Sequence, residues 1–153
     1  MEELLNIVVK FREAIDRAMN EGEFARDFSF NNFPRGCCGD ASDILGHYLL
    51  TQGIRTKYVC GNYYGEDEGY GQSHAWLLLG DEIIIDITGD QFKFNPIFLK
   101  YSIPVYIGSC DAFHALFEVE PRRDVRDITY INELGPFCAP RLSKLYAKII
   151  QYM

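Results

Sequence analysis

The stretch GQSHAWLLLGDEIIIDITGDQF, residues 71–92, contains two apolar runs of β-forming residues separated by Gly80 and Asp81. Such runs on either side of a glycine turn are typical of a β-hairpin. His74 opens the first run and Asp86 stands near the end of the second. Because burying either side chain costs free energy unless it has a polar partner, the pattern predicts that these two residues bind each other or a third group.

The length of the hairpin connection decides whether His74 and Asp86 can meet. Side chains alternate between the two faces of a sheet, so a two-residue turn at Gly80 and Asp81 would place them on opposite faces. An odd-numbered connection or a bulge would place them on the same face. A three-residue loop over residues 79–81 would set His74 directly across from Asp86. We therefore predict an odd connection or a bulge.

The rest of the chain supplies helices at both ends and further strands between them. Apolar residues recur at helical spacing in three segments. The sequence predicts helices from the N-terminus to just before Gly22, over residues 38–52 and from Pro140 onwards, and strands at 56–63, 104–108 and 127–131. The stretch 23–36 shows neither period and predicts an irregular connection. This order favours an α+β fold in which an antiparallel sheet packs against an N-terminal helical part.

Composition limits the size and the partners of the protein. Its 153 residues are 48% apolar, so we expect one core and a single domain over residues 1–153. The 22 acidic residues outnumber the 15 basic residues, and the net charge of −7 argues against a nucleic-acid partner. The charged N-terminal stretch and the lack of a long apolar run predict no signal peptide and no membrane partner, so we expect a cytoplasmic protein.

Five cysteines occur at irregular spacing, without a CxxC pair. An odd number fits free thiols better than a disulfide framework, and a zinc site has little support, so we expect no metal and no cofactor. One of them, Cys38, lies at the start of a predicted helix. Unpaired N–H groups and a nearby imidazolium both lower a thiol pKa, which thiolate chemistry requires. Cys38, His74 and Asp86 are therefore our candidate nucleophile, base and orienting acid.

The string RGCCGDASDILGHYLLTQGI, followed by HAW and DIT, resembles the transglutaminase-like superfamily of papain-type folds. The resemblance covers roughly residues 34–92. In that family a cysteine begins a helix ending in Gly-Ile, a histidine opens a strand as H-A-W, and an aspartate lies in the next strand within D-x-T. It implies a papain/transglutaminase-like core in which Cys38 is the nucleophile, His74 the general base and Asp86 its orienting acid.

Other residues of the predicted site have weaker signals. Gln91 is a candidate for binding the oxyanion together with the backbone N–H of Cys38, and Asn31 and Asn32 are further candidates. Each of them also fits a turn-capping role. Trp76 is expected in the core and as a wall of the site.

Several polar residues are read as structural. Cys37 points elsewhere on the helical turn and is expected to pack, while His47 and His114 are interpreted as structural or surface residues. The loop NYYGEDEGYGQ, residues 62–72, fits either a solvated connection or a lid over the site.

The expected function is hydrolysis or acyl transfer through an acyl-enzyme on Cys38. The substrate would be a peptide, a protein or a small amide, and the class includes proteases, amidases, deamidases and transglutaminases. Arylamine N-acetyltransferases and NlpC/P60 peptidases use the same cysteine acyl-transfer chemistry and are rival assignments within this class. Two alternatives remain open: a non-catalytic binding module on the same fold, and a thiol-based redox sensor that uses Cys37 and Cys38, with Cys60 if it lies near.

Overall fold

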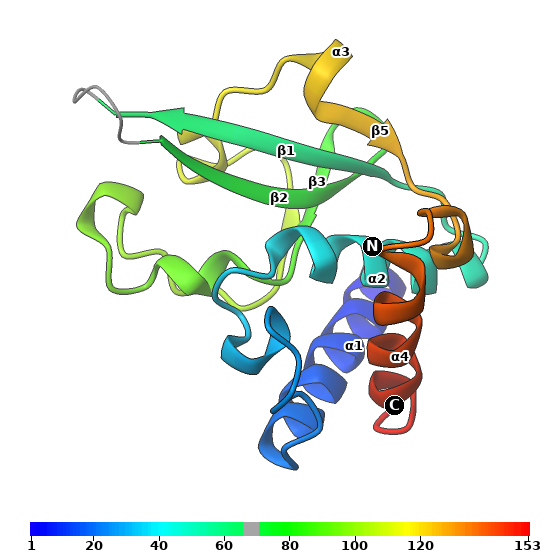
Figure 1. Ribbon diagram of the computed structural model, residues 1–153. Helices are drawn as coiled ribbons and strands as arrows, with labels where there is room; N and C mark the ends of the chain where they lie inside the picture. The colour runs from blue at the N-terminus through cyan, green and yellow to red at the C-terminus, as the bar shows by residue number, and fades with distance from the viewer. Residues whose placement is uncertain (66–70) are drawn as a thin grey trace.

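The computed structural model describes residues 1–65 and 71–153, which form helices at both ends of the chain and a sheet between them (Figure 1). The α-helices are α1 Glu2–Asn20, α2 Cys38–Thr51, α3 Pro121–Asp124 and α4 Ala139–Ile150. The strands are β1 Lys57–Tyr64, β2 Gly71–Leu79, β3 Ile83–Asp86, β4 Tyr106–Gly108 and β5 Val125–Asp127. Short 3-10 turns η1 to η5 lie at Phe30–Asn32, Gly89–Phe92, Pro96–Phe98, His114–Leu116 and Ile131–Glu133.

The five strands form one antiparallel sheet in the order β4-β3-β2-β1-β5. Helices α1, α2 and α4 lie on one side of this sheet, with α2 directly beneath it (Figure 1). The predicted α+β class with an antiparallel sheet is therefore confirmed. Within the described residues, no helix has both the length and the apolar character needed to cross a bilayer.

The larger core lies between the helices and one face of the sheet. The predicted apolar stripe of α1 is buried there, as are the inward residues of α2 and Leu77 of β2. Gly53 follows α2 with φ +80°, the left-handed conformation that commonly ends a helix. The packing of α2 on β2 brings its first turn close to the strand that carries His74.

A second, largely aromatic core covers the opposite face of the sheet. Trp76 of β2 and Ile84 of β3 point into it. The segment 92–117 supplies most of the remaining members, which are Phe92, Phe98, Tyr101, Phe113 and Phe117. Because residues 74, 76 and 78 share a face, His74 points into this second core and is enclosed by it.

The hairpin between β2 and β3 has an odd connection, as predicted. Leu79 pairs with Ile83, so residues 80–82 form a three-residue loop, and Gly80 takes φ +62°. His74 and Asp86 therefore lie on the same face of the sheet. The predicted loop over residues 79–81 is wrong by one position, and Asp86 continues the register opposite Trp76. It lies diagonal to His74, within reach of a long side chain.

Two weaker strand predictions needed correction. The strand predicted at 127–131 ends at Asp127, because the chain turns there into η5, and β5 instead begins at Val125. The strand predicted at 104–108 is shorter and begins at Tyr106. Of the loop at 62–72, residues 66–70 lie outside the described residues, so the lid interpretation is untested.

A buried arginine ties α1 to the segment that follows β3. The guanidinium of Arg12 donates to the carbonyl oxygens of Ile87 at 2.7 Å and Pro104 at 3.0 Å. It also forms an ion pair with Asp90 at 2.8 Å. Arg12 is 7% exposed, so these contacts are shielded from water. They hold the chain between Asp86 and Gln91, which carries part of the predicted site.

Replacing Arg12 by methionine is expected to lower the free energy of unfolding by about 3 kcal/mol, because Asp90 and two carbonyl groups would lose their donor. Urea denaturation measures the change. Arg17→Met is the control, since Arg17 lies on the same helix and its contacts, with Glu13 at 3.4 Å and the carbonyl oxygen of Tyr152 at 3.0 Å, are exposed. That change should stay within about 0.5 kcal/mol. Equal losses in both variants would contradict the special role of Arg12.

Candidate active site

Cys38 is the first residue of α2, where backbone N–H groups lack acceptors within the helix. Gly36, two residues before Cys38, has φ +72°, a left-handed conformation that favours glycine. The side chain of Cys38 is half-buried, whereas Cys37 is 2% exposed and packs into the larger core. The start of the helix therefore favours negative charge at Cys38, whereas burial disfavours it at Cys37.

A carboxylate in the first turn of α2 is balanced by an arginine from α4. Arg141 donates to Asp40 at 2.6 Å and lies 3.3 Å from Asp27. An unpaired negative charge at Asp40 would oppose a thiolate at Cys38. The ion pair with Arg141 offsets that repulsion.

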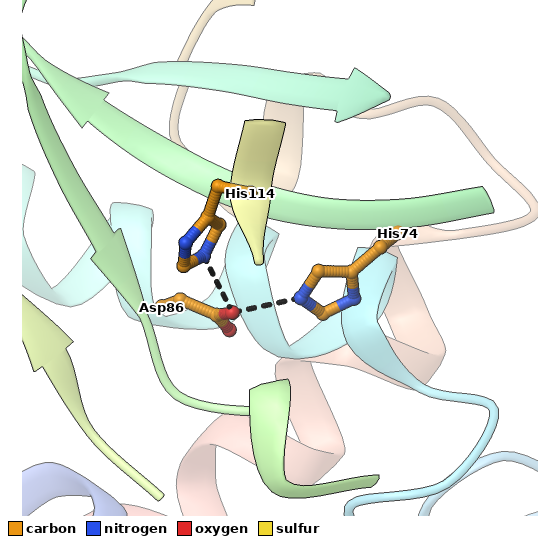
Figure 2. Close-up of side chains that lie close together, drawn as sticks. All are labelled: His74, Asp86 and His114. Carbon is orange, nitrogen blue, oxygen red and sulfur yellow. Dashed lines mark hydrogen bonds and ion pairs between the residues drawn. The ribbon is translucent and has the colours of Figure 1, made fainter. Parts of the chain in front are cut away.

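His74 and Asp86 meet in the interior from neighbouring strands (Figure 2). Nε2 of His74 lies 2.7 Å from Oδ2 of Asp86, and both side chains are buried. Oδ1 of Asp86 accepts the backbone N–H of Thr88 at 2.8 Å. Because the carboxylate accepts, Nε2 carries a proton and Nδ1 is the nitrogen that remains to face a thiol.

The charges of this pair stabilise each other. Burial by itself would lower the pKa of His74, but attraction to Asp86 and the hydrogen bond between them raise that pKa to about 9. Burial would likewise raise the pKa of Asp86, but the two neighbouring histidines hold it well below the ordinary value. An imidazolium next to a carboxylate is therefore the favoured state at neutral pH.

Cys38 differs from its neighbour in the direction of its pKa. Burial would raise the pKa of Cys38, but hydrogen bonding and charge attraction from His74 and the backbone N–H of Ala75 outweigh burial, and the pKa is lowered. Burial raises the pKa of Cys37 instead. All five cysteines are free, and Cys38 has the surroundings of a reactive thiol.

Gln91 lies beside the ring nitrogen that faces the thiol. Its amide nitrogen is 3.3 Å from Nδ1 of His74 and donates to the carbonyl oxygen of Thr88 at 3.0 Å. It also borders a hollow of about 230 Å³ between residues 32–35 and 90–94. Asn32 lines this hollow, whereas Asn31 is exposed and does not line it.

Aromatic rings enclose His74 on the side away from the helices. Trp76, predicted as core and site wall, is 4% exposed, and its ring centre lies 5.8 Å from that of His74. The rings of Phe92, Phe113 and Phe117 lie at 5.2, 5.6 and 5.5 Å. This shell excludes water from the His74–Asp86 contact, which strengthens its electrostatics.

His114 was interpreted as a structural or surface residue, and its burial excludes the surface alternative. It is 1% exposed, and its Nε2 lies 3.1 Å from the same Oδ2 of Asp86 that His74 contacts (Figure 2). Its Nδ1 lies 2.7 Å from Oδ1 of Asp111. No motif marks this residue in the sequence, although a histidine within FHALF, an apolar run, was a signal of a buried partner.

His47 fits its structural interpretation. Its Nδ1 accepts the backbone N–H of Ile131 at 3.1 Å, and its ring packs edge-on against Tyr146. Burial lowers its pKa. These contacts attach η5 and α4 to α2 and involve none of the residues around Cys38.

His74, Asp86 and His114 are also side chains that can bind a metal, and their ligand atoms lie within 4.8 Å of one another. Both histidines face one carboxylate oxygen at 2.7 and 3.1 Å, which are distances of direct hydrogen bonds. Two ligand atoms that each lie about 2.0–2.2 Å from a tetrahedral zinc ion are farther from each other than Nε2 of His74 is from Oδ2 of Asp86. Shared protons account for this spacing without an ion.

The arrangement brings the three residues predicted from the sequence into one connected group. The predicted contact between His74 and Asp86 is present, and His74 acts on the pKa of Cys38. Comparison of the chain with protein-family models, curated proteins and solved structures finds no match to any of them.

Proposed function

We propose that this protein is a cysteine hydrolase or acyltransferase of the transglutaminase-like type, with a papain/transglutaminase-like core. The observation that carries the proposal is the position of His74. One nitrogen is held by a buried carboxylate 2.7 Å away, and the other faces a helix-initial thiol whose pKa is lowered. These are the nucleophile, base and orienting acid that acyl transfer requires.

Before the reaction begins, the proton of Cys38 already lies on Nδ1 of His74, which leaves a thiolate beside an imidazolium. The thiolate then attacks the carbonyl carbon of an amide or a thioester. The tetrahedral intermediate collapses, and His74 returns the proton to the leaving amine or thiol. In the second half, water or an amine attacks the acyl-enzyme while His74 takes its proton, and the thiol is released.

The substrate side of the site is proposed to include Gln91 and the hollow beside it. An amide nitrogen next to Nδ1, together with the backbone N–H of Cys38, would bind the carbonyl oxygen as it becomes negative. Arg35, Lys93 and the exposed ring of Phe94 line the hollow. A peptide or amide whose side chain carries an apolar part and a negative charge fits this lining.

The other two functions have less support. A redox sensor needs a second reactive thiol, but burial raises the pKa of both Cys37 and Cys60. A binding module has no need for a buried carboxylate that orients a histidine toward a thiol. Such a group costs free energy to bury, so we favour chemistry at Cys38.

A small thioester tests the proposal without knowledge of the natural substrate. Mixing the protein with S-phenyl thioacetate is expected to release about one equivalent of thiophenol per chain rapidly, followed by slower turnover. Mass spectrometry should find one acetyl group, attached to Cys38. Added hydroxylamine reports whether an amine accepts the acyl group, since acetohydroxamate would then form.

The same experiment separates the rival functions. Acetylation spread over several cysteines, and equally fast after unfolding in urea, would favour a set of ordinary or sensing thiols. Absence of any acetylation at Cys38 would favour the binding module. Either result would contradict the proposed acyl-enzyme.

A further inference from the structure

Asp86 is shared by two histidines, and only His74 has a ring nitrogen that no carboxylate holds. Oδ2 of Asp86 lies 2.7 Å from Nε2 of His74 and 3.1 Å from Nε2 of His114. His114 is in turn held by Asp111, whose Oδ1 lies 2.7 Å from Nδ1 and accepts the backbone N–H of His114 at 2.8 Å. The contacts form a continuous chain from Asp111 to His74.

The partners of His114 determine where its protons lie. The pKa of Asp86 is lowered, and so is that of Asp111, because hydrogen bonds from His114 and Tyr101 outweigh the opposing effect of burial. Both residues are therefore carboxylates, which can only accept. Each ring nitrogen of His114 therefore faces an acceptor, and a ring that donates from both nitrogens carries a positive charge.

The two histidines consequently differ in what they can do. Nδ1 of His74 faces Cys38 and can exchange a proton with it, whereas both nitrogens of His114 are committed to carboxylates. The ring centres lie 6.3 Å apart, so a fixed positive charge at His114 repels a positive charge at His74. His114 also competes with His74 for the same oxygen of Asp86. Both effects make the proton on His74 easier to release.

We propose that His114, held by Asp111, is a positioning residue that shares Asp86 with His74 and keeps the His74 imidazolium acidic enough to return its proton. The inference rests on the proposed function, because it concerns the proton that His74 passes to the leaving group. Without this second cation, the carboxylate would hold the His74 proton more tightly. Deprotonation of His74 would then require a higher pH.

The groups around the two rings are few. His74 faces Cys38 from α2, Asp86 from β3 and His114. His114 faces Asp86, Asp111 and the rings of Tyr101 and Tyr106, at 5.9 and 5.2 Å between centres. The hydroxyl of Tyr101 donates to Asp111 at 3.1 Å, and that of Tyr106 donates to the carbonyl oxygen of Ser109. Asp86 and Asp111 are thus the anions that act on His114 in the described structure.

The test is the titration of His74 in His114→Gln, which removes the positive charge and retains an N–H group. NMR of the imidazole rings follows His74 directly, because the chain has only three histidines. In the unaltered protein His74 should titrate near pH 9. In the variant, the midpoint should rise by about one pH unit, as expected for losing a like charge about 6 Å away. The alkaline step in Cys38 alkylation by iodoacetamide should move with it.

Asp111→Asn is the second variant, since it removes the carboxylate that holds His114 and leaves the His114 ring in place. It should move the His74 midpoint in the same direction by a smaller amount. Tyr106→Phe is the matched control, because it removes a hydroxyl from the same packing shell and leaves both histidines and both carboxylates intact. Its His74 midpoint should not change.

A purely structural role for His114 predicts the opposite sign, because a loosened Asp86 would hold the His74 proton less tightly. A midpoint that is unchanged or lower in folded His114→Gln would therefore overturn the proposal. So would one equivalent of zinc in the purified protein, or a neutral His114 ring in the NMR spectrum of the unaltered protein at pH 7. The protonation of the His114 ring in the spectrum of the unaltered protein tests the proposal even if the variants do not fold. A slow Cys38 in the unaltered protein would instead contradict the proposed function.

Discussion

Thioester turnover falls by about 10³-fold or more in Cys38→Ser, the largest effect we expect from any single substitution. The reason is the position of the thiol at the start of α2, opposite a histidine that lowers its pKa. A serine hydroxyl in the same place is far harder to deprotonate, and His74 would have to do so without a stable ion pair. Steady-state release of thiophenol measures the loss.

Cys37→Ala is the matched control because it changes the adjacent cysteine in the same turn. Cys37 is buried in the larger core, where burial raises its pKa, so it holds no thiolate at neutral pH. Turnover should stay within about threefold of the unaltered protein, although some stability will be lost with the packing. If turnover fell as much in Cys37→Ala as in Cys38→Ser, the assignment of Cys38 as the nucleophile would be wrong. Circular dichroism verifies that both variants are folded.

His74→Ala has the second largest expected effect, on both turnover and the pH dependence of the thiol. Turnover should fall by about 10³-fold, since general acid and base catalysis are both lost. In the unaltered protein, the alkylation rate of Cys38 should rise with pH less steeply than that of an ordinary thiol, because its pKa is lowered, and should change again near pH 9, where His74 loses its proton. In the variant, the rate should rise about tenfold per pH unit through neutrality, as for an ordinary thiol.

The histidine at position 74 also makes stability depend on pH with a definite sign. Its pKa is raised on folding to about 9, so the protonated ring stabilises the native state fully below its unfolded pKa of about 6.5. This contribution is lost as pH rises through 9. The free energy of unfolding, measured by urea denaturation, should therefore fall more between pH 6.5 and pH 9.5 in the unaltered protein than in His74→Ala.

His47→Ala is the control for these measurements. His47 is bonded to the backbone of η5, away from Cys38, so its removal should cost stability and leave the alkylation profile of Cys38 unchanged. A profile in His74→Ala that matches that of the unaltered protein would show that the histidine does not activate the thiol. The proposed mechanism would then be wrong.

Much of the fold and part of the site follow from local patterns. The apolar stripe of α1, the helix that begins at Cys38 and the two strands of the hairpin were all predictable, because each needs only a periodicity and a stop signal. The odd hairpin connection was predicted because His74 and Asp86 each cost free energy to bury without a polar partner, and only an odd connection places them on the same face. The strand at 125–127 was placed wrongly because short edge strands depend on their partner β1 and not on their own composition.

Contacts between distant segments were not predictable from those patterns. Arg12 lies on α1 beside the apolar stripe, and besides nearby Asp16 its partners are 75 or more residues away. His114 likewise reaches Asp86 from a segment without a motif. Both residues are buried charged or polar groups, and only the folded chain shows which carboxylates and carbonyls they satisfy.

The sequence by itself determined that a thiol begins a helix and that a histidine and an aspartate lie on one face of a hairpin, because helix starts and strand alternation are local properties of the chain. The tertiary structure alone decided that Asp86 serves two histidines and that His114 lies between two carboxylates. The physical reason is that pKa and hydrogen-bond partners depend on which groups are within a few ångströms in the interior. That proximity arises from the packing of α2 and of segment 92–117 on opposite faces of the sheet.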